Sequence, residues 1–273
     1  KQILKEQGVD IKVVTTLHGT DITLVGSHPS YKTAVEFSIN NSDAVTTVSN
    51  SLKKQTLELF EIKKEIQVIY NFIELDKYPS ISSEDCQRNS IASEGERILT
   101  HISNFRPVKR IPDVIDVFYK VQQKVPSKLL LVGEGPALVA ARRQVKKYNI
   151  EDKVLFLGNS VEIEKILCYT DVFLLPSQTE SFGLAALEAM AARSAVISSN
   201  AGGLSEVNEH GITGFLSPVG DTDDMAKHAL YMLEDFDRLQ RFKNNALEHS
   251  KKFSLDEILP VYEEIYETLV QKK

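Results

Sequence analysis

Several features that mark particular protein classes are missing from this 273-residue sequence. No apolar run approaches the ~20 residues that a membrane-spanning helix requires. Basic residues are not in excess, because the formal net charge is -6 and the pI is near 5.6, whereas nucleic-acid-binding surfaces are basic. The two cysteines, Cys86 and Cys168, lack the spacing of a metal-binding pair. We therefore expect a cytoplasmic protein with free thiols that binds neither nucleic acid nor membrane.

The sequence does contain a repeated alternation of strand-like and helix-like stretches. Short apolar runs followed by segments of helical period are typical of parallel βαβ units with helices on both faces of the sheet. Ligands of such sheets bind beyond the carboxyl ends of the strands. Strands are predicted at residues 11–17, 44–48, 67–70, 98–102, 128–132, 154–157, 172–175 and 195–198, and helices include residues 111–124, 137–148 and 183–192.

A polar stretch at residues 74–96 divides the chain, since it lacks apolar periodicity and contains Pro79. Residues 1–70 are then the C-terminal part of a first Rossmann-like lobe. Residues 71–252 form a complete doubly wound lobe, and residues 253–273 form an amphipathic C-terminal helix. The chain opens with the pattern of a helix end capped by Gly8, directly before a buried strand. We therefore expect the first lobe to be incomplete, with further sequence upstream.

The strongest motif follows the predicted strand at residues 172–175 and opens a helix. A helix N-terminus favours phosphate through its unpaired N–H groups and partial positive charge, and Gly183 allows close approach of a ligand. Glu188 lies about 8 Å along the helix axis from Gly183 at ~1.5 Å per residue, roughly the separation of a diphosphate from a ribose. Two solvated acids at a helix start are the alternative interpretation. The motif comprises Glu180, Ser181, Phe182, Gly183, Leu184 and Glu188.

Two glutamates separated by seven residues around Ser-Phe-Gly-Leu resemble the motif of retaining glycosyltransferases of family 4. The resemblance covers Val13 to Tyr266 and implies the α/β GT-B fold, with two Rossmann-like doubly wound lobes of which the first is incomplete here. It also implies that the helix at residues 253–273 returns to the first lobe, although this helix could instead cap the second. It also implies transfer of a sugar from a nucleotide donor. Other similar segments are the glycine turn at 132–136 with Gly133, the loop at 157–161 with Val161, the Gly-Gly turn at 200–206, and a hairpin at 211–216.

The resemblance also assigns roles to individual residues. Lys109 aligns with the family lysine at the donor diphosphate, whereas Asn104 stands where the family has an arginine. Arg106 either takes over that role or points elsewhere, because side chains alternate along an extended segment. His18 is expected to face the donor sugar near its anomeric carbon, and Thr16 to face the acceptor. The expected catalytic residues are His18, Lys109 and Glu180, and the expected donor contacts are Asn104, Arg106, Gly133, Val161, Ser181, Phe182, Gly183, Leu184 and Glu188.

Residues 16–26, 38–43 and 103–106 resemble one group within the family. Its members transfer N-acetylglucosamine from UDP-GlcNAc to L-malate at the start of bacillithiol biosynthesis. The resemblance implies these two substrates, no cofactor and no essential metal, although neither composition nor spacing identifies malate. The alternatives are a family-4 transferase with another acceptor, a UDP-sugar epimerase of the same fold, and a non-catalytic binding module. Self-association into a homo-oligomer stays open.

Overall fold

The computed structural model describes residues 1–20, 22–23, 28–78 and 88–271. The chain forms two compact units, one made of Lys1–Phe72 with Phe253–Lys273 and the other of Ile73–Lys252. Both are α/β units with parallel sheets. Part of the segment at residues 16–26, together with Pro79 and Cys86, lies outside the described residues.

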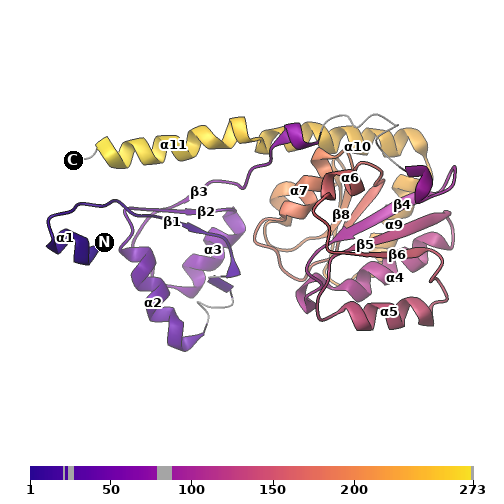
Figure 1. Ribbon diagram of the computed structural model, residues 1–273, viewed down its shortest axis with the longest axis horizontal. Coiled ribbons are helices and arrows are strands. Elements are labelled where there is room, and N and C mark those ends of the chain that lie inside the picture. The colour runs from indigo at the N-terminus through magenta and orange to yellow at the C-terminus, as the bar shows by residue number, and fades with distance from the viewer. Residues whose placement is uncertain (21, 24–27, 79–87, 272–273) are drawn as a thin grey trace. The chain divides into compact units, whose positions relative to one another are not determined.

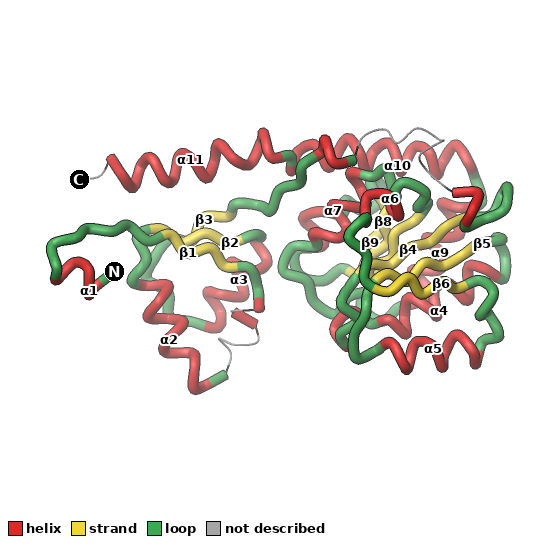
Figure 2. Tube along the Cα trace, in the orientation of Figure 1, coloured by secondary structure: helices red, strands yellow, loops and turns green. Residues whose placement is uncertain are grey.

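The first unit is built on a three-stranded parallel sheet in the order β1-β2-β3. Its elements are α1 (Gln2–Glu6), β1 (Val14–Leu17), α2 (Pro29–Asn40), β2 (Ala44–Thr47), α3 (Asn50–Leu59), β3 (Ile66–Val68) and α11 (Leu255–Gln271). Within this unit, α11 runs along one side of the sheet, and α2 and α3 lie on the other (Figures 1 and 2). The apolar stripe of α11 is covered unevenly, because Ile258 is 8% exposed while Tyr266 is 49% exposed.

The second unit contains a six-stranded parallel sheet in the order β6-β5-β4-β7-β8-β9. The strands are β4 (Arg97–Ile102), β5 (Ser127–Val132), β6 (Val154–Gly158), β7 (Val172–Leu175), β8 (Ala195–Ser199) and β9 (Gly214–Ser217). The helices are α4 (Ile111–Gln122), α5 (Leu138–Lys147), α6 (Ile163–Leu167), α7 (Leu184–Ala191), α8 (Leu204–Val207), α9 (Thr222–Leu233) and α10 (Phe236–Ser250). Helix α4 packs against α5 and α9, and α7 packs against α6, α8 and α10.

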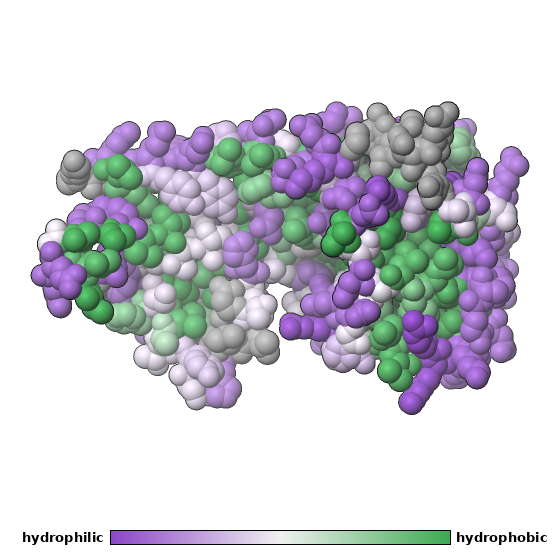
Figure 3. Space-filling view, viewed as in Figure 1, coloured by the Kyte–Doolittle hydropathy of each residue, from purple (hydrophilic) through white to green (hydrophobic). Residues whose placement is uncertain are grey.

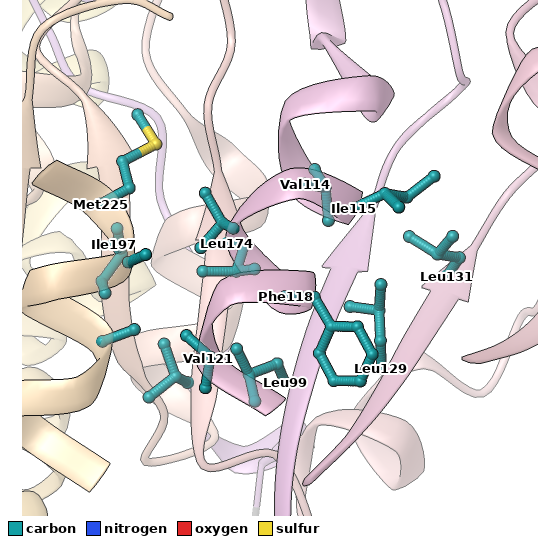
Figure 4. Close-up of a cluster of buried hydrophobic side chains, with 14 of the residues drawn as sticks. Leu99, Val114, Ile115, Phe118, Val121, Leu129, Leu131, Leu174, Ile197 and Met225 are labelled. Atoms are coloured by element: carbon teal, nitrogen blue, oxygen red, sulfur yellow. The ribbon is translucent and has the colours of Figure 1, made fainter. Parts of the chain in front are cut away.

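Both faces of this sheet are buried, which explains why its strands are continuous apolar runs. Successive side chains of a strand point to opposite faces. Leu99 and Leu129 therefore join the large core under α4, where Phe118 lies against them (Figure 4), while Ile98 and Leu130 pack with other partners. This rigid layer fixes where each strand ends and its loop begins.

The amino ends of β4 and β7 are held by a buried carboxylate. Asp171, just before β7, accepts hydrogen bonds from the amide of Ile98 at 2.9 Å and from the guanidinium of Arg88 at 2.8 Å. Lys243 of α10 donates to its other oxygen at 3.4 Å. The cluster attaches both α10 and the end of the connecting segment to this edge of the sheet.

Two expectations from the sequence are wrong. Residues 211–216 were expected to form a hairpin, but Gly214–Ser217 is strand β9, which pairs in parallel with β8. Cys168, expected to be a free thiol, is disulfide-bonded. Strand β9 requires glycine at its first position, because a Cβ at Gly214 would lie 1.7 Å from the carbonyl oxygen of Val196.

The surface is mixed in character. Hydrophilic and apolar side chains are interspersed on the face shown in Figure 3. Within the described ranges, no helix has both the length and the apolar character required to cross a membrane.

Candidate active site

The predicted donor site lies where the connections of the six-stranded sheet change direction. From β4 the chain proceeds to β5 and β6 on one side, and it then returns to β7 on the other side of β4. Loops that leave neighbouring strands in opposite directions open a crevice at the carboxyl ends, which is where α/β sheets bind ligands. The two loops at this point carry Lys109 and Glu180.

Lys109 and Glu180 form an ion pair between these two loops. Both side chains are mostly buried, with exposed fractions of 22% and 12%. The hydroxyl of Ser177 donates to the same carboxylate oxygen, Oε1, at 2.9 Å. The loop backbones are also joined, since the amide of Gln178 donates to the carbonyl of Val108 at 2.8 Å. Two residues predicted separately from distant motifs are thus in direct contact.

The loop after β7 rests on the Gly-Gly turn that follows β8. A Cβ at Gly202 would lie 1.9 Å from the carbonyl oxygen of Glu180, and one at Gly203 would lie 2.4 Å from that of Ser181. The amide of Gly203 also donates to the carbonyl of Glu180 at 2.9 Å. Because any side chain at the turn would displace this backbone, the two glycines fix the position of Glu180.

Helix α7 begins at the predicted anion site. Gly183 is its N-cap with a φ of 104°, and a Cβ there would lie 2.6 Å from a methyl carbon of Leu204. Phe182 is only 1% exposed, so its ring belongs to the core, whereas Leu184 is 42% exposed. The side chain of Phe182 therefore anchors the helix start, and only its backbone is available for the predicted donor contact.

Glu188 lies farther along α7 and has an unusual environment. Burial, and secondarily the charge of Glu164, raises its pKa to about 7. Among the described residues, no hydrogen bond or ion pair engages its carboxyl group. Tyr78 lies nearby, since the pKa of its phenol is raised by burial and then by the charges of Glu188 and Glu164. No sequence pattern indicated Tyr78, because it lies in a segment that was interpreted as an exposed connector.

The loop after β4 presents two of the predicted donor residues. Asn104 and Arg106 are both exposed, on either side of Phe105, which is fully buried with a φ of 39°. Gly133 supports this loop from below, because a Cβ there would lie 1.8 Å from the carbonyl oxygen of Ser103. Gly133 is therefore a packing position beneath the loop.

The other predicted residues lie apart from this cluster or in the first unit. Val161 follows the edge strand β6 and is 95% exposed. His18 follows β1 and is exposed. The hydroxyl of Thr16 accepts a hydrogen bond from that of Thr46 at 2.8 Å. Burial raises the pKa of Tyr262 in α11, and hydrogen bonds with both threonines act against this rise. Thr16 thus has a role within its own unit that the sequence did not indicate.

Metal binding has no obvious site in the described part of the chain. No group of three or more His, Cys, Asp or Glu side chains there is arranged to hold a metal ion.

Comparison with known proteins agrees with this architecture. Residues 83–249 match the family model described as glycosyl transferases group 1, and residues 3–77 match that of glycosyltransferase family 4. The N-acetyl-alpha-D-glucosaminyl L-malate synthase of Bacillus anthracis is 44% identical over 267 residues, which cover 97% of this chain and 69% of that protein. The chain belongs to the group 1 glycosyltransferases. The family resemblance drawn from the sequence is therefore confirmed, and the chain is an enzyme of the transferase class.

Solved structures confirm the fold class of this glycosyltransferase. Anabaena HepE in complex with UDP and glucose has a TM-score of 0.81 at 22% identity, covering 95% of this chain and 71% of HepE. Sucrose-phosphate synthase from Thermosynechococcus elongatus has a TM-score of 0.84 at 23% identity, covering 100% of this chain and 71% of that protein. The predicted α/β GT-B fold is correct.

Proposed function

We propose that this glycosyltransferase transfers N-acetylglucosamine from UDP-GlcNAc to the hydroxyl group of L-malate, with retention at the anomeric carbon. The observation that carries the proposal for the donor is the pairing of Lys109 with Glu180 at the point where the sheet reverses direction. The proposal for the acceptor rests on the 44% identity to the malate synthase of Bacillus anthracis.

The diphosphate, the sugar and the ribose of the donor each have a suitable partner in the second unit. Lys109 supplies positive charge for the diphosphate, and the start of α7 adds the partial positive charge of a helix N-terminus. Glu180 engages Lys109 and Ser177 through Oε1, which leaves Oε2 for sugar hydroxyls. Glu188 accepts hydrogen bonds from the ribose hydroxyls, which provide partners that its half-buried carboxyl group lacks among the described residues.

The reaction requires stabilisation of a leaving group. As the malate hydroxyl forms its bond to the anomeric carbon, the bond from that carbon to the phosphate oxygen breaks and negative charge develops on the diphosphate. The departing phosphate takes the hydroxyl proton on the same face of the sugar. Lys109 stabilises the developing charge, a contribution of about 3 kcal/mol for one preorganised group. His18 hydrogen-bonds the sugar, Thr16 lies on the acceptor side, and no essential metal takes part.

The direct test is release of UDP from UDP-GlcNAc with and without L-malate. We expect release to require L-malate and to be absent with succinate, which has the two carboxylates but no hydroxyl group. The product should be the α-glycoside, as determined by NMR of the anomeric proton. Release that depends on a different acceptor would contradict the assignment of malate. Isomerisation of the UDP-sugar without UDP release would identify an epimerase, and UDP binding without any turnover would identify a binding module.

A further inference from the structure

A buried histidine next to the candidate site is not accounted for by the proposed roles. His101 lies near the carboxyl end of β4 and is fully buried. Its Nδ1 atom is 2.8 Å from the carbonyl oxygen of Leu174 in β7, and its Nε2 atom is 2.8 Å from the hydroxyl oxygen of Ser103. The ring therefore joins the two strands between which the sheet changes direction, and it also touches the loop after β4.

The chemistry of these partners fixes the direction of the hydrogen bonds. A carbonyl oxygen can only accept, so the Nδ1 atom of His101 carries the proton and donates to Leu174. Burial lowers the pKa of His101 to about 4, so the ring is neutral near pH 7 and Nε2 is an acceptor. The hydroxyl of Ser103 therefore donates to His101, and its oxygen accepts from the amide of Phe105 at 3.3 Å. We call His101, Ser103 and the amide of Phe105 the His101 relay.

The relay holds the loop in a conformation that it would not adopt alone. Phe105 has a φ of 39°, in a region that residues other than glycine rarely occupy. Its ring packs against that of His101 with centroids 6.2 Å apart, and its carbonyl accepts from the amide of Ala137 at 3.0 Å. The left-handed turn buries Phe105 and leaves Asn104 and Arg106 exposed on either side of it. The relay thus determines how these two residues are presented.

We propose that His101 is a positioning residue for recognition of the donor diphosphate, acting through Ser103 on the loop that carries Asn104, Arg106 and Lys109. This proposal rests on the proposed function, since it assumes a UDP-sugar donor. The proposal predicts different effects on recognition of the diphosphate and recognition of the ribose. The relay supports the diphosphate loop after β4, whereas Glu188, the proposed ribose partner, lies in α7 after β7.

The test compares the affinities of UDP and uridine by calorimetry for the wild type and for Ser103→Ala and His101→Asn. Each variant loses the hydrogen bond between positions 101 and 103 that holds the loop. We expect UDP to bind about tenfold more weakly while uridine binding changes less than about twofold, as for loss of a positioned hydrogen bond to a charged ligand. His101→Gln, whose amide oxygen can occupy the place of Nε2, should retain most of the preference for UDP.

A matched control separates positioning from general destabilisation. The hydroxyl of Thr100, on the same strand as His101, lies 2.7 Å from that of Thr170, which precedes β7, and both groups are buried. Thr100→Val should lower the melting temperature about as much as Ser103→Ala and leave the preference for UDP over uridine unchanged. If Ser103→Ala weakens the binding of UDP and uridine equally, or weakens neither, the preference for UDP is unchanged and the positioning role is overturned. If the wild type shows no preference for UDP over uridine, the proposed function fails, and the positioning role fails with it.

Discussion

The two ends of β4 and β7 both bury charge, but they do so in different ways. At the amino end, both oxygens of Asp171 are occupied, by Arg88 and the amide of Ile98 on one side and by Lys243 on the other. At the carboxyl end, Lys109 and Glu180 form one ion pair between two loops, and Glu188 has no partner among the described residues. Among the described residues, the carboxylate at the amino end has both oxygens hydrogen-bonded, whereas Glu188 at the carboxyl end still has hydrogen-bonding capacity.

This difference indicates which charges serve stability and which serve binding. A buried charge is tolerated only when it is paired and hydrogen-bonded. Burial lowers the pKa of Lys243, and the neighbouring Asp171 acts in the opposite direction, as expected of a compensated pair. Burial raises the pKa of Glu188, and none of the residues that the structure describes compensates for it. Such uncompensated carboxyl groups in a cleft are typical of functional sites.

The largest effect is expected at the amino end. Asp171→Ala leaves Lys243 and Arg88 without their buried partner, and it should lower the free energy of unfolding by about 3–5 kcal/mol. Chemical denaturation measures this loss. UDP affinity of the folded variant should be unchanged, since the residue lies at the opposite end of the strands from Lys109.

An exposed ion pair provides the control for this variant. The side chains of Glu162 and Lys165 are 62% and 65% exposed. Glu162→Gln should change stability by less than about 0.5 kcal/mol, because exposed pairs contribute little. A comparable loss in both variants, or weakened UDP binding in Asp171→Ala, would remove the contrast between the two ends.

At the carboxyl end, Lys109→Ala should lower turnover about 100-fold, equivalent to about 3 kcal/mol of transition-state stabilisation. The expected cause is loss of the charge proposed to stabilise the departing diphosphate, and steady-state kinetics measures the change in turnover. The neighbouring Arg110 pairs with Asp113 at 2.6 Å, and its φ is 52°. Arg110→Asn is the control, because asparagine tolerates this backbone conformation, and it should retain turnover within about threefold. A loss below about threefold in Lys109→Ala would exclude the proposed role.

Replacement of Glu188 by glutamine should increase the stability of the protein at pH 8 and weaken its binding of UDP. Its pKa in the folded protein, about 7, is above the ordinary value of 4.5. The folded state therefore binds the proton more tightly than the unfolded state, and stability is lost as the pH rises from 4.5 to 7. Glu188→Gln removes this loss and should be more stable than the wild type at pH 8 by about 3 kcal/mol, with little difference near pH 4.5.

The same variant should bind UDP about tenfold more weakly, because an amide replaces the carboxylate proposed to accept hydrogen bonds from the ribose hydroxyls. Thermal unfolding at the two pH values and calorimetry with UDP measure the two effects. A variant that is less stable at pH 8, or that binds UDP as well as the wild type, would show that Glu188 is a structural residue.

The sequence predicted the core of the second unit well for a physical reason. Strands buried on both faces are continuous apolar runs, so β7 was predicted with the bounds that it has, and α7 within one residue at each end. Strand β9 was missed because it is a short edge strand whose first residue is a glycine. The need for Gly214 arises from the approach of β8, which no local pattern reveals.

The site was predicted residue by residue but not as an arrangement. Lys109 and Glu180 are 71 positions apart, and their contact depends on β4 lying next to β7. His101 gave no signal, because a single histidine in a buried strand does not reveal its hydrogen-bond partners. The roles of the site residues came from the family resemblance, and they remain predictions that the variants test.

The smallest effect is expected from Glu180→Gln, and it tests whether the ion pair at the carboxyl end is shared with the donor. If Glu180 recognises the sugar, the variant should raise KM for UDP-GlcNAc about tenfold, as for one hydrogen bond to a charged group. UDP affinity should stay within about twofold, because the glutamine still accepts from Ser177 and Lys109 remains available to the diphosphate. Calorimetry with UDP and with UDP-GlcNAc separates the two contributions. A collapse of UDP binding would mean that Glu180 serves mainly to hold Lys109 in place, and the carboxyl end would then resemble the amino end.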